Sequence, residues 1–271
     1  MIPLSNLSVF ELRGNDARQF LQNQLSADID AIAIGAAGFA CCCNPAGRVL
    51  ALLLVMPLED RFMLVLSADL AEEIRAWLGR FVLRADVQMA ARNDLFVATG
   101  GAAAVSRAAH GPVAPVAGLS YVLLDEPFPD LEPEKGGGHH WKAEELQRGV
   151  CWLDSVTSGQ FLPQMLGFER IGALSFRKGC FPGQEVIART RYLGKLKRRP
   201  LLLRAGLGQA LPALQKLSLE TAAGPVSAVL VDQAAVGAER WLFTVVRAEQ
   251  EVTPLGMVVD GKAVSLARFD P

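Results

Sequence analysis

The sequence predicts an α+β fold in which helices lie on antiparallel strands, and three observations support this class. The chain has 271 residues, of which 51% are hydrophobic, so it can bury a large core. Its first half alternates strand-like apolar runs with amphipathic helical segments. From about Pro200 onward, short strands are separated by glycine and proline, which is typical of a small antiparallel barrel or sandwich.

The N-terminal portion, residues 1–125, is expected to hold strands covered by helices. Two apolar runs on either side of an Asn-Pro-Ala-Gly turn at 44–47 predict a β-hairpin. A first helix is predicted where Asn15 or Asp16 can act as the N-cap, and a second where Asp69 can do so. Further strands are predicted at 7–14, 61–68, 83–89, 94–99 and 120–125.

Composition marks the remaining boundaries. Residues 126–140 contain three prolines and a triple glycine, so they are expected to form an exposed loop or linker. A second α+β portion is expected over 141–199, with helices at 141–150 and 184–193. The C-terminal portion, residues 200–271, is then the predicted barrel.

Charge and cysteine usage exclude several classes of protein. The net charge is −1, which argues against bulk electrostatic capture of nucleic acid or lipid but leaves a local basic patch open. The longest apolar run has about ten residues, too few to span a membrane, and the first residues lack the pattern of a signal peptide. Five cysteines without a C-x-x-C pair fit free thiols in a reducing compartment. We therefore expect a cytoplasmic protein without a membrane partner.

Metal binding is not expected from the histidine and cysteine pattern. Neighbouring side chains of a strand point to opposite faces, so Cys41, Cys42 and Cys43 cannot converge on one ion. We predict that they are buried strand residues. His139 and His140 are adjacent and lack the i, i+4 spacing of a metal pair.

The segment 177–199 differs from the rest of the chain. Cys180 precedes a predicted helix start, where unpaired amide groups gather, and Lys178 lies two residues before it; both favour a thiolate. A buried and inert thiol fits the same sequence. Gln184 is suited to hydrogen-bond the edge of a heterocycle, and Glu185 falls in the first helical turn, where a carboxylate complements the dipole.

Positive charge is densest at the end of this segment. A solvated face is the usual meaning of such a run, but an anionic ligand such as a polycarboxylate tail, a phosphate or RNA also fits. Tyr192 is suited either to stack on a planar ring or to pack in the core. The predicted helix places Val186, Thr190 and Leu193 along one stripe. The basic residues are Arg189, Arg191, Lys195, Lys197, Arg198 and Arg199.

The stretch KGCFPGQEVIARTRYLGKLKRR resembles the signature of the YgfZ-type folate-binding proteins, Lys-Gly-Cys-aromatic-x-Gly-Gln-Glu followed by a basic Tyr-Leu-Gly-Lys segment. Residues 20–29 and 158–164 are also similar to that family, so the resemblance spans nearly the whole chain. The family is related to the T-protein of glycine cleavage, the tetrahydrofolate-dependent aminomethyltransferase. The resemblance implies an aminomethyltransferase-like three-part fold around a central folate channel, with a C-terminal β-barrel and with Cys180 at the channel.

The resemblance also implies a cofactor, partners and site residues. The cofactor is tetrahydrofolate or a derivative, and the role is to support iron–sulfur proteins or their assembly machinery, including iron–sulfur enzymes that modify tRNA, with at most weak RNA contact. Cys180 is the candidate reactive thiol. The candidate cofactor-binding residues are Lys178, Gly179, Gly183, Gln184, Glu185, Arg189, Tyr192 and Lys195.

Two departures from the T-protein bear on catalysis. Its aspartate after the first hairpin is replaced here by Ala51 or Leu52, and its pterin-binding glutamate falls near Gln147 and Arg148. Since a positioned carboxylate contributes strongly to rate, we expect a binding protein rather than an enzyme. Two alternatives stay open: a folate-dependent aminomethyl or one-carbon transferase that uses other residues, and an RNA- or protein-binding module built on 189–199.

Overall fold

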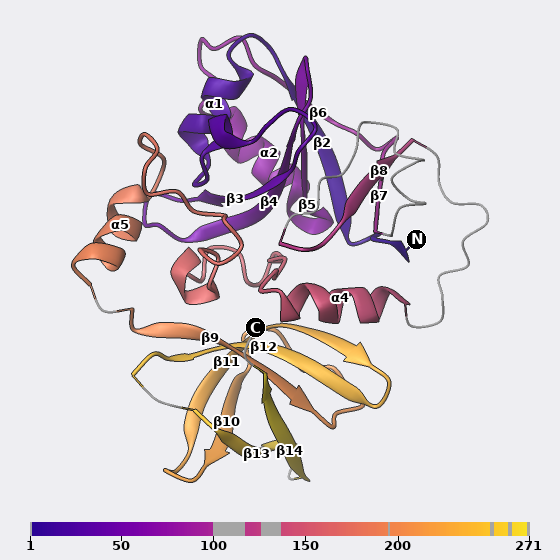
Figure 1. Cartoon of the computed structure of the whole chain (residues 1–271), viewed down its shortest axis with the longest axis vertical. Helices are drawn as coiled ribbons and strands as arrows, with labels where there is room; N and C mark the ends of the chain where they lie inside the picture. Colours follow the sequence, from indigo (N-terminus) through magenta and orange to yellow (C-terminus); the bar gives the residue numbers. More distant parts are fainter. Residues whose placement is uncertain are drawn as a thin grey trace.

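The computed structural model describes residues 2–99, 117–125, 137–194, 196–249, 252–259 and 262–269. Sheets and helices of the N-terminal half form one end of the molecule, and a β-barrel forms the other (Figure 1). Helix α4 (Gly137–Gln147) lies between them and contacts β1, β11 and β12. None of the described helices is long and apolar enough to cross a membrane.

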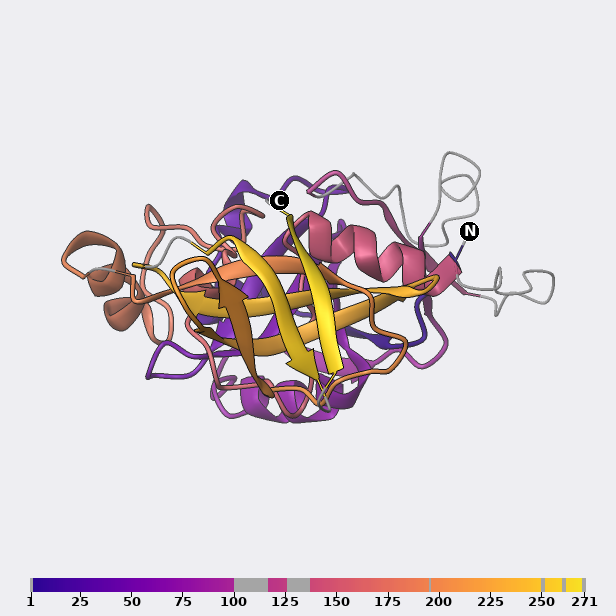
Figure 2. The same ribbon diagram turned by 90° about the horizontal axis from the view of Figure 1, so that it is seen from below.

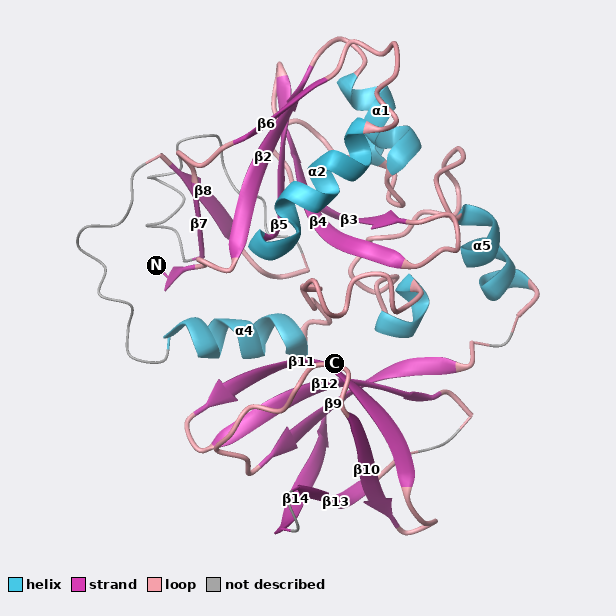
Figure 3. Cartoon of the chain, turned by 180° about the vertical axis from the view of Figure 1, so that it is seen from behind, coloured by secondary structure: helices cyan, strands magenta, loops and turns pink. Residues whose placement is uncertain are grey.

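A five-stranded antiparallel sheet is the centre of the N-terminal part, with the strand order β3-β4-β5-β2-β6. Helices α1 (Ala17–Gln24) and α2 (Ala71–Gly79) lie in front of this sheet in Figure 3. A second sheet has the order β1-β7-β8. The strands are β1 (Ile2–Pro3), β2 (Leu7–Arg13), β3 (Gly38–Cys43), β4 (Val49–Pro57), β5 (Arg61–Ser67), β6 (Gln88–Ala91), β7 (Phe96–Thr99) and β8 (Tyr121–Leu124).

The second part of the chain is mostly irregular. It contains the 3-10 helix η3 (Pro163–Leu166) and helix α5 (Gln184–Tyr192), and two further 3-10 helices, η1 (Ile29–Ala31) and η2 (Ala68–Leu70), lie in the N-terminal part. Helix α5 lies at the outer edge of the molecule in Figures 1 and 2.

The C-terminal strands close into a barrel in the order β10-β11-β12-β9-β14-β13. Figure 2 shows these strands in front of the N-terminal part. Alternate side chains point inward, as in β10, where leucines alternate with exposed polar residues. The strands are β9 (Arg198–Ala205), β10 (Lys216–Thr221), β11 (Val226–Val236), β12 (Glu239–Arg247), β13 (Pro254–Val259) and β14 (Lys262–Phe269).

Two hydrophobic cores hold the molecule together. One fills the barrel and includes Leu203, Leu219 and Leu242. The other runs from the five-stranded sheet through α4 to the outer wall of the barrel, where Phe243 and Val245 belong to it. The barrel is therefore attached to the rest of the chain by apolar packing of its wall.

Most predicted elements are confirmed, including the α+β class, the closed barrel and the hairpin at 44–47. The prediction of a strand over 83–89 is wrong at its start, because residues 83–87 form turns and bends before β6 begins at Gln88. The expected loop at 126–140 is only partly described. Residues 126–136 lie outside the described residues, and residues 137–140 form the first turn of α4 instead of loop.

The predicted side-chain caps are wrong. Asp16 is the N-cap residue of α1, but its carboxylate accepts a hydrogen bond from the backbone N–H of Asp86 at 2.8 Å instead. The Asn15 side chain likewise donates to Asp86 at 2.8 Å. Asp69 accepts from the backbone N–H of Ser155 at 2.8 Å, and α2 begins two residues later. In each case the side chain that was expected to cap a helix forms its hydrogen bond with a loop distant in sequence instead.

Candidate functional site around the residue 178–185 motif

Gly183 determines how the motif enters α5. It has φ of 80°, a left-handed conformation that favours glycine, and it is the N-cap residue of the helix. A Cβ atom at Gly183 would lie 2.5 Å from the carbonyl oxygen of Asn44 and 2.6 Å from the Cα of Gly47. Two backbones therefore meet here without room for a side chain, and α5 is held against the turn of the β3–β4 hairpin.

The side chain of Lys178 forms hydrogen bonds at the C-terminal end of helix α1. Its ammonium group donates to the carbonyl oxygens of Gln22, of Leu25 at 2.6 Å and of Ala27 at 3.0 Å. A cation at this end satisfies carbonyls that have no helical partner and complements the dipole. Three acceptors use all three N–H donors. Lys178 thus joins the motif to α1, a role that the sequence did not predict, and its cofactor-binding role stays a prediction.

Cys180 is the exposed thiol of this protein. The other four cysteines, Cys41, Cys42, Cys43 and Cys151, are buried. Burial raises the pKa of Cys42 to about 12 and that of Cys151 well above its ordinary value, so these thiols stay protonated near neutral pH. The prediction that the triplet consists of buried strand residues is confirmed. The three cavities described below do not include Cys180 among their lining residues.

The other motif residues divide between two sides of α5. The Gln184 side chain donates to the carbonyl oxygen of Gly179 at 3.4 Å, which closes the loop that carries Cys180. Glu185 and Arg189 instead line a cavity of about 350 Å³ together with Lys197. The structure therefore brings Glu185 and Arg189 together and does not bring Cys180 to them.

The outer face of α5 differs from the prediction. The side chain that α5 buries is Ile187, whereas Val186 and Leu193 of the predicted stripe are exposed. Tyr192 is 65% exposed and does not pack in the core. Lys195, a predicted cofactor-binding residue, lies outside the described residues.

Glu145 is a candidate functional residue that the sequence reasoning missed. It lies on α4, is buried, and accepts hydrogen bonds from the hydroxyl of Tyr121 at 2.7 Å and from the indole N–H of Trp152 at 2.9 Å. Burial raises the pKa of Glu145 to about 7, and the two donors oppose the effect. The sequence contained a sign of this residue. Trp141 and Glu145 are spaced i, i+4 on the predicted helix, so the acid shares a helix face with a large aromatic side chain.

A second charged pair connects α4 to the barrel. The Lys142 ammonium lies 2.6 Å from a carboxylate oxygen of Asp232 on β11. Burial raises the pKa of Asp232, and the neighbouring Lys142 opposes this. Because Tyr121 lies on β8, α4 links the three-stranded sheet to the barrel through polar contacts as well as packing.

Several buried polar atoms in the described part of the chain lack a hydrogen-bond partner, and three of them lie on elements around α4. They are the hydroxyl of Thr99, the indole N–H of Trp141 and the second carboxylate oxygen of Asp232. Thr99 is paired with Tyr121 across β7 and β8, and the Tyr121 and Trp141 rings are 5.8 Å apart. Unsatisfied buried groups are costly, so these three atoms are candidate contacts for a ligand. None of them lines the cavities at β2 or beside α5.

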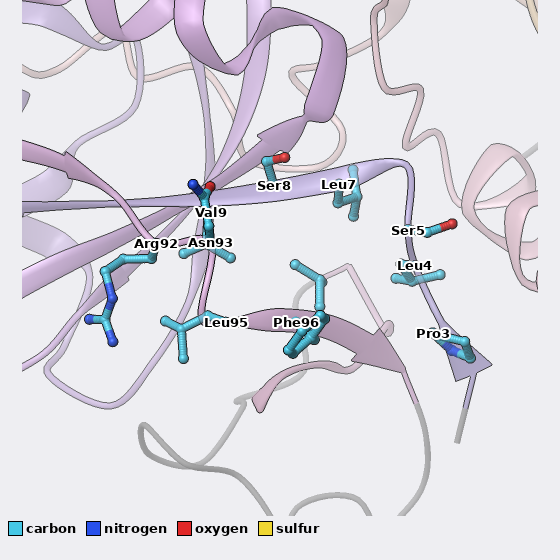
Figure 4. Close-up of a pocket in the computed structure, with 11 residues that line it drawn as sticks. Pro3, Leu4, Ser5, Leu7, Ser8, Val9, Arg92, Asn93, Leu95 and Phe96 are labelled. Carbon is cyan, nitrogen blue, oxygen red and sulfur yellow. The ribbon is translucent and has the colours of Figure 1, made fainter. Parts of the chain in front are cut away.

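The largest described cavity, about 430 Å³, lies elsewhere and contains none of the predicted site residues. Figure 4 shows its lining, which comes from β1 and the segment after it, from β2, from the β6–β7 connection and from β7. Leu95 and Phe96 form part of its wall, while the guanidinium of Arg92 is held by Glu11 at 2.8 Å and by Asp94. This cavity offers an apolar wall but no free charged group in the described residues.

Comparison with known proteins agrees with the resemblance seen in the sequence. The profile of the GCVT N-terminal domain matches residues 1–101. The chain is 26% identical over 227 residues to a protein named tRNA-modifying protein YgfZ from Klebsiella pneumoniae (strain 342), covering 73% of this chain and 69% of that protein. It is 27% identical over 235 residues to the protein of the same name from Colwellia psychrerythraea, covering 77% and 72% respectively.

A solved structure gives the fold. The glycine cleavage system aminomethyltransferase T from Bartonella henselae superposes with a TM-score of 0.68 at 16% identity, covering 99% of this chain and 84% of that chain. The predicted aminomethyltransferase-like fold with a C-terminal barrel is confirmed, and so is the resemblance to YgfZ-type proteins.

Proposed function

Because the chain resembles YgfZ-type proteins and shares the fold of aminomethyltransferase T, we propose that it is a folate-binding accessory protein that supports iron–sulfur enzymes, including enzymes that modify tRNA. The ligand is tetrahydrofolate or a derivative, and the partners are iron–sulfur proteins or their assembly machinery. The five free thiols suit a reducing cytoplasm.

The observation that carries the folate proposal is the fold that 99% of the chain shares with aminomethyltransferase T, and the unsatisfied polar atoms around α4 are candidate ligand contacts. A pterin ring presents several donors and acceptors along its edges, and the indole N–H of Trp141, the hydroxyl of Thr99 and the carboxylate of Asp232 are complementary to such a ring. The aromatic rings of Tyr121 and Trp141 pack edge to face beside these atoms, with centroids 5.8 Å apart. When bound, a folate supplies one-carbon chemistry, while these residues bind and orient it.

Catalysis of aminomethyl transfer is the weaker alternative. Ala51 and Leu52 are buried on β4, and this strand contains no carboxylate between Gly47 and Pro57. The acid that is near the proposed folate site, Glu145, is buried and held by two donors. Asp232, the other acid there, pairs with Lys142 at 2.6 Å. Because both acids are already engaged by donors or by a cation, the site supports binding more than turnover.

Titration with 5-formyltetrahydrofolate tests the folate proposal. We expect a saturable change in tryptophan fluorescence and an increase in Tm with ligand concentration. Trp141→Phe keeps an aromatic side chain but removes the indole N–H, so we expect the Kd to rise about tenfold. Trp77→Phe, on α2 and outside the α4 region, is the matched control and should leave the Kd unchanged. Absence of any ligand-induced change in the unmodified protein would reject folate binding.

The same protein tests whether Cys180 is the reactive thiol. We expect iodoacetamide under native conditions to label Cys180 well before the four buried cysteines, because it alone is exposed. Mass spectrometry of tryptic peptides gives the order of labelling. In cells that lack the protein, Cys180→Ala should restore less iron–sulfur enzyme activity than the unmodified chain; full restoration would show that the thiol has no role in this function.

A further inference from the structure

The surface around α5 concentrates positive charge. Residues 169–199 contain nine lysines and arginines and two glutamates, a formal charge of +7 in a chain whose total is −1. The remainder of the chain therefore carries −8. Lys178 is engaged by carbonyls at the end of α1, so eight of the nine cations remain for this surface. An excess of this size attracts a polyanion to one face of an otherwise acidic protein.

Aromatic and arginine side chains on this surface form an ordered group, which we call the Tyr192 platform and define as Phe176, Arg191 and Tyr192. The Arg191 guanidinium lies 4.3 Å from the centroid of the Phe176 ring and 6.0 Å from that of Tyr192. The two rings are 6.0 Å apart at 78°, and Glu169 holds Arg191 through a 2.6 Å hydrogen bond. Despite these contacts Tyr192 remains 65% exposed.

Two cavities of about 350 Å³ each lie beside the platform. One is lined by three guanidinium side chains, those of Arg170, Arg191 and Arg199. The other is lined by Arg189 and Lys197. Each cavity also has one carboxylate in its lining, Glu169 in the first and Glu185 in the second, so cations outnumber acids in both. Thr190, Gly194 and Leu196 line both, so the two cavities are neighbours on either side of one short segment. Two adjoining cavities suit successive anionic groups of a chain better than a single small anion.

We propose that this surface binds single-stranded RNA, with one base stacked on Tyr192 and backbone phosphates in the two basic cavities. Guanidinium groups pair well with phosphate oxygens, and exposed aromatic rings beside arginine are the usual stacking platform for unpaired bases. An acidic protein surface would match the charge, but it would not use the exposed ring that Phe176 and Arg191 hold in place. The proposal does not depend on folate, since the platform and its cavities share no residue with the α4 site.

Fluorescence anisotropy with a labelled oligouridylate of about 12 nucleotides, measured from about 50 to 200 mM salt, tests the proposal. We expect binding that weakens steeply with salt, because bound cations are released from the phosphates. Tyr192→Ala should weaken binding roughly tenfold, whereas Tyr192→Phe, which keeps the ring, should bind within about twofold of the unmodified protein. The exposed position of Tyr192 leaves the fold intact in both variants.

A second pair of variants separates charge from stacking. Arg189→Gln with Lys197→Gln, which removes both cations of one cavity, should weaken binding and reduce the slope of log K against log salt by about 1.4, two phosphate contacts at about 0.7 each. Arg84→Gln removes one exposed charge outside the basic surface, and it should change neither the affinity for RNA nor the salt slope.

Three outcomes would overturn the inference. They are equal affinity of Tyr192→Ala and the unmodified protein, a salt slope that the Arg189 and Lys197 changes leave intact, and displacement of the RNA by a polyglutamate peptide or by inorganic polyphosphate of matched charge. The last result would assign the surface to any polyanion. Folate binding of the same variants is measured in a separate titration. Loss of RNA binding and loss of folate binding can therefore be distinguished.

Discussion

At the scale of single residues, Glu145 is a carboxyl group whose protonation changes on folding. Its side chain is buried near Tyr121, Trp141 and Trp152, and its pKa is raised to about 7. The unfolded chain has lost this proton at pH values where the folded chain still holds it. Nearby charge, from Lys142 and Asp232, adjusts the shift without cancelling it.

Glu145 should make the protein less stable as pH rises. Between the unfolded pKa of 4.5 and the folded pKa of about 7, the folded state binds more protons, so the free energy of unfolding falls as pH increases through this window. The full effect is on the order of 3 kcal/mol. Glu145→Gln keeps an acceptor but cannot titrate, so its stability should lack this component, as measured by urea unfolding at several pH values between about 5 and 8.

The matched control is Glu144→Gln. Glu144 is half-exposed on the same helix and pairs with Arg148 at 3.0 Å, so the change should leave the pH dependence almost as it is. A constant stability difference between the unmodified protein and Glu145→Gln across the pH series would contradict the prediction. Asp232 is expected to add a slope of the same sign, because its pKa is also raised by burial.

At the scale of elements, the contact between the hairpin turn and the start of α5 fixes the motif in place. Gly183 and Gly47 both have positive φ, and each lies where a Cβ would meet the other segment's atoms. The Lys178 ammonium holds the same loop to the end of α1. The motif is therefore clamped between α1 and the hairpin, which leaves Cys180 facing outward.

Substitution at Gly183 should disturb this contact severely. Gly183→Ala introduces both backbone strain and overlap with the Asn44 carbonyl, and we expect it to cost more than about 3 kcal/mol of unfolding free energy. Gly172→Ala is the control, because Gly172 has φ of 73° and a Cβ added there would meet no other atom within 4 Å, so only strain of about 1 to 2 kcal/mol applies. Urea unfolding compares the two. Equal costs would show that the close approach does not matter.

At the scale of the whole molecule, a shared hydrophobic core and the Lys142–Asp232 pair connect the parts in the described portion of the chain. The barrel has its own interior, and its wall shares a core with α4 and the five-stranded sheet. The Lys142–Asp232 pair lies at that junction, largely shielded on the Asp232 side, where the side chain is 13% exposed. The two groups lie 2.6 Å apart, which favours their attraction, but removing both charges from water on folding costs free energy.

Breaking this pair should cost more than breaking a surface pair. Asp232→Asn leaves the Lys142 ammonium without a counter-charge, and we expect a loss of roughly 2 to 3 kcal/mol. Replacing both residues, with Lys142→Met and Asp232→Leu, should regain much of the loss. Glu239→Gln breaks the exposed pair with Arg204 and should change stability by less than about 0.5 kcal/mol. Thermal unfolding of these variants and of the unmodified protein measures the stability losses. If Asp232→Asn and Glu239→Gln lower stability equally, the pair at the junction contributes no more than a surface pair.

Local patterns made much of the fold predictable. The alternation and turn residues around 44–47 predict the hairpin, and the spaced short strands after Pro200 predict the barrel, since both depend on neighbours in sequence. The start of α5 after Gly183 follows from the Pro-Gly turn for the same reason. The triplet of cysteines was correctly placed in a buried strand because strand geometry alone rules out convergence.

The sequence by itself determined the class of fold, the barrel and the position of the motif before α5. Only the tertiary structure decided that Lys178 serves carbonyls more than 150 residues away, that Cys180 faces outward, and that Glu145 meets Tyr121 and Trp152. The physical reason is that helices, turns and strand alternation depend on short-range geometry, whereas the charge state and partners of a side chain depend on which distant segments folding brings against it.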